Sequence, residues 1–450
     1  MIPLLLSIAL QSSPAAPASI LPPAPAGWRS ERLTFPLDFA PAIDLRGVED
    51  LRFAPGMFQP ASESYFSYAL ALHLEGDVEI DLAFLQRFLD DYYRGLCTAV
   101  AAERKLDFDA DEIEVSVRPD GARYRARIAM IDPFTTGEPL ELELELESRS
   151  LPRATELLGL ASPLDPEAPI WKELRALGAA WRAARPAPVF LNHVYLVPDA
   201  ATYEALRSAE FLRELGVFEE RETVRADASY RGLYLYGRRT YFEFLPPGAA
   251  GLAEGASGIA FGLEVRDQTD ELAAGLEEAG ISAQGSGITR QHEGQQVPWF
   301  RILGIEMPAG PLTVFSMEYA PRFLERWNPG PTPAGIARAD VLARYAAVLR
   351  TVDRPAPLGD VSEVRLALDD AQRERLIAVC ELAGYEVEAG ADAWTLHGPQ
   401  HRLVVQRSKE PGGVTGLGLT LQSPVDREPL ELGRIRLEFH GATADLRWTH

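Results

Sequence analysis

Residues 185–199, Arg-Pro-Ala-Pro-Val-Phe-Leu-Asn-His-Val-Tyr-Leu-Val-Pro-Asp, open the part of the chain that decides the fold. A proline-rich linker comes first. The apolar and aromatic run that follows it predicts a buried strand over residues 189–197. Pro198 and Asp199 end this strand, and the Ala- and Leu-rich residues up to Gly216 predict a helix. The stretch therefore begins a strand–helix unit.

The same order of features occurs twice more along the chain. The linker recurs at residues 354–357 and leads to a predicted strand at residues 361–368 and a helix at 371–384. Another copy lies between the two, with a strand at residues 257–265 and a helix at 269–280, and Asp267 follows Asp199 by 68 residues. Because one such unit cannot cover its own sheet, the repetition predicts duplicated modules that pack on one another.

Three strands are expected after each helix, which gives modules of the form β-α-β-β-β. They are residues 218–224, 231–237 and 240–245 in the first module, 281–290, 299–305 and 312–319 in the second, and 385–389, 394–397 and 401–406 in the third. Residues 414–421 resemble the strand at 257–265 but are followed by two strands, at 434–440 and 443–448, and by no helix. The last module is therefore shortened.

The residues ahead of the modules predict a separate mixed domain. An amphipathic helix is expected from Asp81 to Arg104, and alternating strands at residues 112–117, 124–130 and 140–147. The last strand reads Leu-Glu four times, which indicates one apolar and one acidic face. We interpret Glu141, Glu143, Glu145 and Glu147 as a solvated sheet face rather than a metal site.

The predicted fold class is α+β, in four parts. Residues 1–27 are a signal-like segment with a Pro/Ala spacer, and residues 28–184 form an α+β domain of unknown role. Residues 189–328 form two paired modules, and residues 358–450 form the third module with the shortened fourth.

Composition limits the partners of the protein. The net charge of −22 argues against binding of nucleic acid or anionic lipid, because either surface would repel it. Cys97 and Cys380 are too few for a disulfide framework or a cysteine zinc site, and we expect both to be buried. The apolar residues 1–10 resemble a secretory signal and predict export to the periplasm or the cell exterior, and no stretch is long enough for stable membrane insertion.

Strand–helix–three strands, occurring in pairs, resembles the vicinal-oxygen-chelate superfamily of glyoxalases, bleomycin-resistance proteins and ring-cleaving dioxygenases. The stretches Asn192-His-Val-Tyr195 and Tyr241-Phe-Glu243 are also similar to an uncharacterised bacterial branch of it. The resemblance implies two modules around a cavity, with a divalent metal held by the first and last strands of each. It covers about 260 residues and leaves residues 28–184 unassigned.

Carried over position by position, the resemblance implies a metal site of His193, Glu243 and Glu318. Phe261 stands where a fourth ligand is expected and cannot bind a metal, which leaves one coordination position open. One imidazole with two carboxylates suits Fe(II), Mn(II), Zn(II) or Ni(II), and an open position is what a catalytic metal needs.

Three functions remain open from the sequence. The first is a metal-dependent lyase, isomerase or dioxygenase acting on a small molecule, with no catalytic side chain assigned. The second is a metal-free binding protein whose cavity is lined by Tyr195, Tyr241, Phe261 and Tyr319. The third is a structural or interaction protein of the cell exterior.

Overall fold

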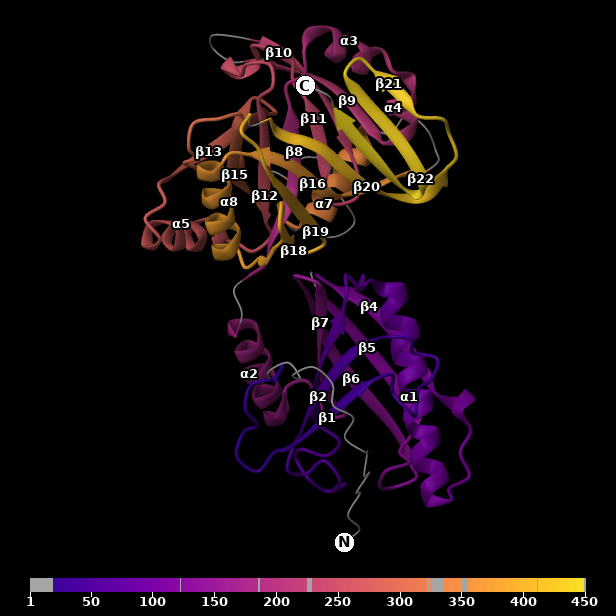
Figure 1. The fold of residues 1–450 in the computed structure, drawn as a ribbon. Coiled ribbons are helices and arrows are strands. Elements are labelled where there is room, and N and C mark those ends of the chain that lie inside the picture. The colour runs from indigo at the N-terminus through magenta and orange to yellow at the C-terminus, as the bar shows by residue number, and fades with distance from the viewer. Residues whose placement is uncertain are drawn as a thin grey trace.

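The computed structural model describes residues 19–121, 123–184, 187–224, 229–321, 324, 336–349, 355–410 and 412–448. The signal-like residues 1–10 and the Arg-Pro that opens the first linker lie outside them, as does Arg354 of the second linker. Figure 1 shows the first domain, in indigo to magenta, below the modules, which run to yellow. No helix of the described residues is long and apolar enough to cross a membrane.

The first domain is a seven-stranded antiparallel sheet in the order β1-β2-β3-β7-β6-β5-β4. Its strands are β1 (Arg29–Phe35), β2 (Gly47–Phe53), β3 (Tyr68–Glu75), β4 (Glu114–Asp120), β5 (Arg123–Ile131), β6 (Pro139–Leu151) and β7 (Ala154–Ser162). Helix α1 (Leu82–Arg104) buries Leu85, Leu89 and Cys97 on one sheet face, and α2 (Pro169–Ala183) places Trp171 and Trp181 on the other (Figure 1). The predicted helix and the alternating strands are confirmed.

The expected spacer is wrong in its last part. Ile20 and Leu21 are buried in the cluster around Trp171, and the backbone N–H of Ile20 donates to Asp50 at 2.7 Å. These two side chains cover apolar surface that α2 leaves open, so residues 19–21 belong to the first domain.

The paired modules form one eight-stranded sheet in the order β13-β14-β15-β12-β8-β11-β10-β9. The first strands of the two modules, β8 and β12, run antiparallel at the centre, and each pairs in parallel with the last strand of its own module. The predicted order of one strand, a helical segment and three strands in each of the two modules is confirmed. The first module comprises β8 (Val189–Leu196), α3 (Ala200–Ser208), α4 (Glu210–Leu215), β9 (Val217–Val224), β10 (Ser229–Tyr236) and β11 (Tyr241–Phe244). The second module comprises β12 (Ser257–Leu263), α5 (Gln268–Glu278), β13 (Ala283–His292), β14 (Gln295–Ile305) and β15 (Leu312–Tyr319).

The third module and the shortened fourth share a second sheet, β17-β18-β19-β16-β20-β22-β21. The predicted last two strands are one, β22, which continues through Gly441. The elements are β16 (Leu358–Leu368), α8 (Asp370–Leu382), β17 (Glu386–Ala389), β18 (Ala393–Gly398), β19 (His401–Arg407), β20 (Gly413–Val425), β21 (Leu430–Leu432) and β22 (Ile435–Trp448).

The eight-stranded sheet has two different faces. We call the face that packs against α3, α4, α5 and the second sheet the core face, because it forms one continuous apolar cluster with them. We call the opposite face, which carries His193, the site face. Helix α7 (Arg338–Leu349) packs on the site face through Val341, Leu342 and Tyr345.

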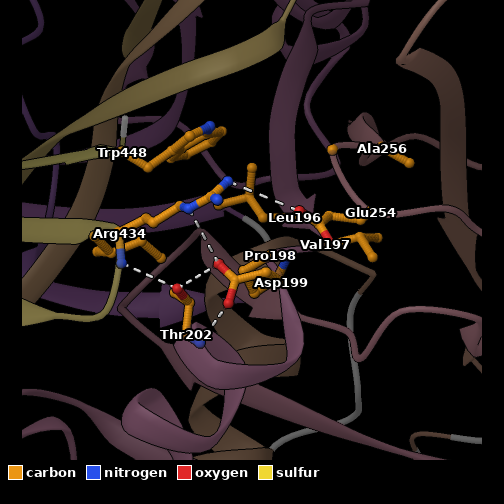
Figure 2. Close-up of a pocket in the computed structure, with 11 residues that line it drawn as sticks. Leu196, Val197, Pro198, Asp199, Thr202, Glu254, Ala256, Arg434 and Trp448 are labelled. Carbon is orange, nitrogen blue, oxygen red and sulfur yellow. Dashed lines mark hydrogen bonds and ion pairs between the residues drawn. The ribbon is translucent and has the colours of Figure 1, made fainter. Parts of the chain in front are cut away.

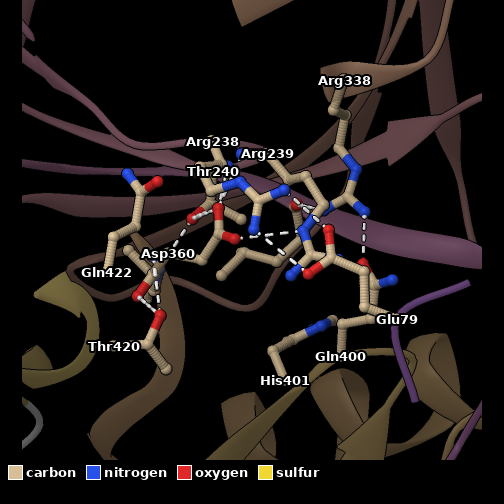
Figure 3. Close-up of polar contacts among 12 residues, drawn as sticks. Glu79, Arg238, Arg239, Thr240, Arg338, Asp360, Gln400, His401, Thr420 and Gln422 are labelled. Atoms are coloured by element: carbon tan, nitrogen blue, oxygen red, sulfur yellow. Dashed lines mark hydrogen bonds and ion pairs between the residues drawn. The ribbon is translucent and has the colours of Figure 1, made fainter. Parts of the chain in front are cut away.

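Polar contacts fix the second sheet and α7 to the paired modules (Figure 3). Asp360 of β16 accepts bonds from the backbone N–H groups of Arg239 and Thr240, at 2.6 and 2.9 Å, in the turn between β10 and β11. The buried Arg338 donates to Glu264 at 2.7 Å and to Gln400 at 3.0 Å. The site face is therefore built on a rigid frame.

Candidate functional site

A β-bulge at Asn192 sets the direction of the candidate residues. Ala260 of β12 pairs with His193, but the next residue, Phe261, pairs with Leu191, so Asn192 is the extra residue. A bulge changes which sheet face the following side chains occupy. Leu191 therefore lies in the core cluster, whereas His193 and Tyr195 face the site side, although strict alternation along a strand without a bulge would put all three on one face.

His193 and Glu243 come together on the site face. His193 Nε2 lies 3.4 Å from Glu243 Oε1, and the two side chains are 4% and 12% exposed. His193 Nδ1 lies 2.9 Å from Asn192 Oδ1, and its ring stacks on Tyr241 with centroids 4.4 Å apart. The imidazole is thus held on three sides by this chain.

Glu318 does not join them. Its carboxylate accepts bonds from the backbone N–H of Asp267 and of Thr269, both at 2.9 Å, and from the Thr269 hydroxyl at 2.6 Å. These groups form the N-terminus of α5, which packs on the core face. The predicted position of Glu318 beside His193 is therefore wrong, because alternation along β15 turns Phe315, Met317 and Tyr319 to the site face instead.

The four aromatic residues predicted to line the cavity lie on both faces of the sheet. Tyr195, Tyr241 and Tyr319 lie on the site face. Phe261 is fully buried in the core cluster and packs edge-on against Tyr385 of the third module, at 5.7 Å. Phe261 joins the two sheets and lines no cavity.

Sheet register arranges the site-face side chains in two rows. In one, Glu243 of β11 lies between Tyr234 of β10 and Tyr195 of β8. The ring of Tyr195 lies over Gly258, where an added Cβ would come within 2.1 Å of it. In the other row, Tyr236, Tyr241, His193 and Phe315 follow one another, with ring centroids 5.2, 4.4 and 5.5 Å apart.

Four residues of this face were missed by sequence reasoning, namely Glu219, Arg221, Tyr234 and Tyr236. Arg221 lies over the ring of Tyr234, 3.9 Å from its centroid, and pairs with Glu219 at 3.3 Å. The Tyr236 hydroxyl donates to the same carboxylate at 2.5 Å. The alternation of Tyr234-Leu-Tyr236 is a sequence signal for two aromatic side chains on one face, but the Arg221 contact needs the pairing of β9 with β10.

The interior of the site face is closed by packed side chains. Tyr345 of α7 stacks on Tyr236 at 5.3 Å. Burial raises the pKa of Tyr241 and that of Tyr319 above the usual range, so both rings carry neutral hydroxyl groups. The end of the face around Glu243, Tyr230 and Phe315 is half-buried rather than buried, and so are Glu219, Arg221 and Phe300 on the same face.

The donor set does not fit a divalent ion of the glyoxalase or dioxygenase kind. Such an ion needs three protein ligands with an open position. His193 and Glu243 supply two, while Ala260, Phe315 and Met317 stand on the corresponding side of the second module. Within the residues that the structure describes, no three His, Cys, Asp or Glu side chains form a metal-binding group.

The cysteines offer no alternative chemistry. Both Cys97 and Cys380 are buried and unbonded to one another, as predicted. Burial raises the pKa of the Cys97 thiol to about 12, so it is no nucleophile at neutral pH.

A separate small pocket lies where the fourth module meets the first (Figure 2). Its volume is about 60 Å³, and Arg434 reaches across it to within 3.7 Å of Asp199 and 3.8 Å of Glu254. That is room for a few water molecules rather than for an organic ligand.

Several solved structures are similar to part of this chain, at low sequence identity. A search of curated proteins finds no match. Solved structures similar to this chain include a hypothetical protein from Staphylococcus aureus (9% identity, TM-score 0.33, 50% of this chain and 87% of that one). The Mn(II)-bound glyoxalase from Novosphingobium aromaticivorans is 14% identical with a TM-score of 0.29, over 51% of this chain and 64% of that one. The 2,2',3-trihydroxybiphenyl 1,2-dioxygenase from Sphingomonas wittichii strain RW1 is 12% identical with a TM-score of 0.31, over 53% of this chain and 74% of that one.

The family models give a more direct assignment. One model matches residues 191–449, which span both module sheets and more than half of the chain. Its description is a family of unknown function, DUF5829. The chain belongs to this family.

Proposed function

We propose that the paired modules bind a small organic cation, an amine or a guanidine, without a metal ion. The observation that carries the proposal is the place of Glu243. Its side chain is partly exposed, at 12%, and Glu243 pairs in register with Tyr195 and with Tyr234 on the neighbouring strands.

A carboxylate among aromatic rings favours a cation for two reasons. The ring faces carry partial negative charge, and a charge-assisted hydrogen bond from an N–H donor to a carboxylate is among the stronger polar contacts. The chain itself makes the same contact one strand away, where the Arg221 guanidinium lies on Tyr234 and pairs with Glu219.

Residues around His193 keep Glu243 in place for such a ligand. The Asn192 amide bonds to Tyr319, which leaves its Oδ1 to accept from His193 Nδ1. His193 Nε2 lies 3.4 Å from Glu243 Oε1, so the imidazole packs beside the carboxylate, and the Tyr241 ring stacks on the imidazole. We assign His193 and Tyr241 the role of positioning the carboxylate, and Glu243 the role of binding.

Calorimetric titration with benzylammonium tests the proposal on the full chain. We expect a dissociation constant in the millimolar range or tighter, and no heat with benzyl alcohol, which has a similar shape without the charge. Glu243→Gln should weaken binding by about tenfold or more. Glu222→Gln, on the exposed side of β9 in the same sheet, is the matched control and should bind as wild type. Equal binding of the alcohol, or equal loss in both variants, would contradict the proposal.

A metal titration tests the competing enzyme function. Chelator-stripped protein should take up no stoichiometric Mn(II), Fe(II) or Zn(II) at micromolar concentration. Uptake of one ion per chain that is lost in His193→Gln would favour the metal-dependent enzyme and would overturn the metal-free site.

A further inference from the structure

A second candidate site lies in the first domain, outside the modules. A groove of about 310 Å³ opens between α2 and strands β5, β6 and β7. This volume is at the lower end of the range of small-molecule sites, about 300 to 1,000 Å³. Its lining combines four arginines with three acids and an apolar floor, namely Arg123, Arg125, Arg175, Arg182, Asp120, Glu145, Glu147, Tyr124, Leu146, Leu158 and Leu160.

The geometry of the groove follows from strand and helix periodicity. On the outer sheet face, register places Arg125, Glu145 and Leu160 in one row across β5, β6 and β7. The row beside it contains Glu147 and Leu158. Arg175 and Arg182 are seven residues apart on α2, so both project from the same side of the helix, toward these rows.

Two glutamates share four guanidinium groups. Glu145 pairs with Arg175 at 2.8 Å and with Arg125 at 3.7 Å. Glu147 pairs with Arg182 at 2.7 Å and with Arg123 at 3.0 Å. With Asp120 included, the lining has four positive and three negative side chains, an excess of one positive charge in a chain whose net charge is −22.

The floor gives the groove a second chemical character. Leu158 and Leu160 are buried beneath α2, and Gly178 lets the helix approach them closely, since an added Cβ would lie 3.3 Å from Leu160. A cationic rim over an apolar floor matches a ligand that has an anionic head and a short apolar body.

We propose that this groove binds a small organic anion, a carboxylate or a phosphate monoester with an apolar group. The anion accepts hydrogen bonds from Arg123 and Arg182, each of which makes one ion pair to Glu147 in the described residues. A planar guanidinium can hold one carboxylate and still present donors to a second anion.

The test is a titration of the full chain with phenyl phosphate at low ionic strength, where screening is weak. We expect saturable binding, about fivefold or more weaker in Arg182→Gln and in Arg123→Gln. Arg127→Gln is the matched control: Arg127 lies on the same strand and pairs with Glu141, but it is outside the groove, so binding should be unchanged.

Three further results decide the assignment. Inorganic phosphate should bind more weakly than phenyl phosphate, and equal affinity would overturn the role of the leucine floor. Equal loss of binding in Arg127→Gln and Arg182→Gln would overturn the groove as the site, because general charge would explain both. No binding of phenyl phosphate at millimolar concentration, with the fold intact by circular dichroism, would also overturn it.

Discussion

Glu49 of β2 should make the first domain less stable as pH rises. Its side chain is fully buried under α1, one oxygen accepts from the Tyr92 hydroxyl at 2.9 Å, and the other has no hydrogen-bond partner in the described residues. Burial raises the pKa of Glu49 from 4.5 to about 8, and the negative charges of Glu31 and Asp50 add to the rise against the hydrogen bond from Tyr92.

The sign and size of the effect follow from proton linkage. The unfolded chain releases this proton near pH 4.5 and the folded chain near pH 8, so the folded state binds more protons between these values. Stability therefore falls as pH rises through this window. A difference of about 3.5 pH units at about 1.4 kcal/mol each gives a loss of about 5 kcal/mol by pH 8.

Glu49→Gln removes the titration and keeps the shape of the side chain. We expect the variant to match wild type near pH 4.5 and to become more stable than it by about 5 kcal/mol at pH 8. Urea unfolding of the first domain, followed by hydrogen exchange of β2 and β3 peptides, measures the difference. Glu63 is an exposed acid of the same domain, so Glu63→Gln should show no pH-dependent difference in stability from wild type. A difference between Glu49→Gln and wild type that stays constant from pH 5 to 8 would refute the reasoning.

Two more predictions test whether Glu318 and Phe261, which the sequence assigned to the site, lie on the core face instead. Glu318→Gln should destabilise the modules by about 1 to 2 kcal/mol in urea unfolding, because it weakens the cap of α5, and should leave benzylammonium affinity unchanged. Phe261→Ala should cost about 3 to 5 kcal/mol in the same assay, because it opens a cavity between the two sheets, and a changed affinity for the probe would contradict its place on the core face.

The module architecture could be predicted because it is repeated and local. Each strand and helix is encoded by its own periodicity, and Asp199, Asp267 and Asp369 mark the helix starts in all three modules. The closeness of His193 and Glu243 could also be predicted, because the first and last strands of such a module are neighbours in the sheet. Export stays a prediction, since residues 1–10 lie outside the described part of the chain.

Side-chain direction could not be predicted to the same degree. The extra residue Asn192 reverses the sheet face of the side chains that follow it in β8. The amino-acid sequence of β8 contains no signal that predicts this bulge. The covering of the site face by α7 could not be predicted from the sequence either. Helix α7 follows the paired modules in the chain, and its packing on Tyr236 depends on Arg338 being held by Glu264 and Gln400.

Glu318 illustrates how a residue at an expected ligand position can serve the fold instead. In the first and third modules, Asp199 and Asp369 cap their own helices by accepting backbone N–H bonds. Asp267 in the second module has a left-handed backbone, with φ of 64°, and its side chain makes no cap bond. The exposed N–H groups of α5 still need an acceptor.

Glu318 supplies that acceptor from the last strand of the same module, with three hydrogen bonds. A glutamate on this strand is therefore required whether or not a metal binds, because without it the start of α5 would lose its acceptor. Of the three predicted ligands, Glu318 is therefore engaged at the start of α5, and His193 and Glu243 are the two that come together on the site face.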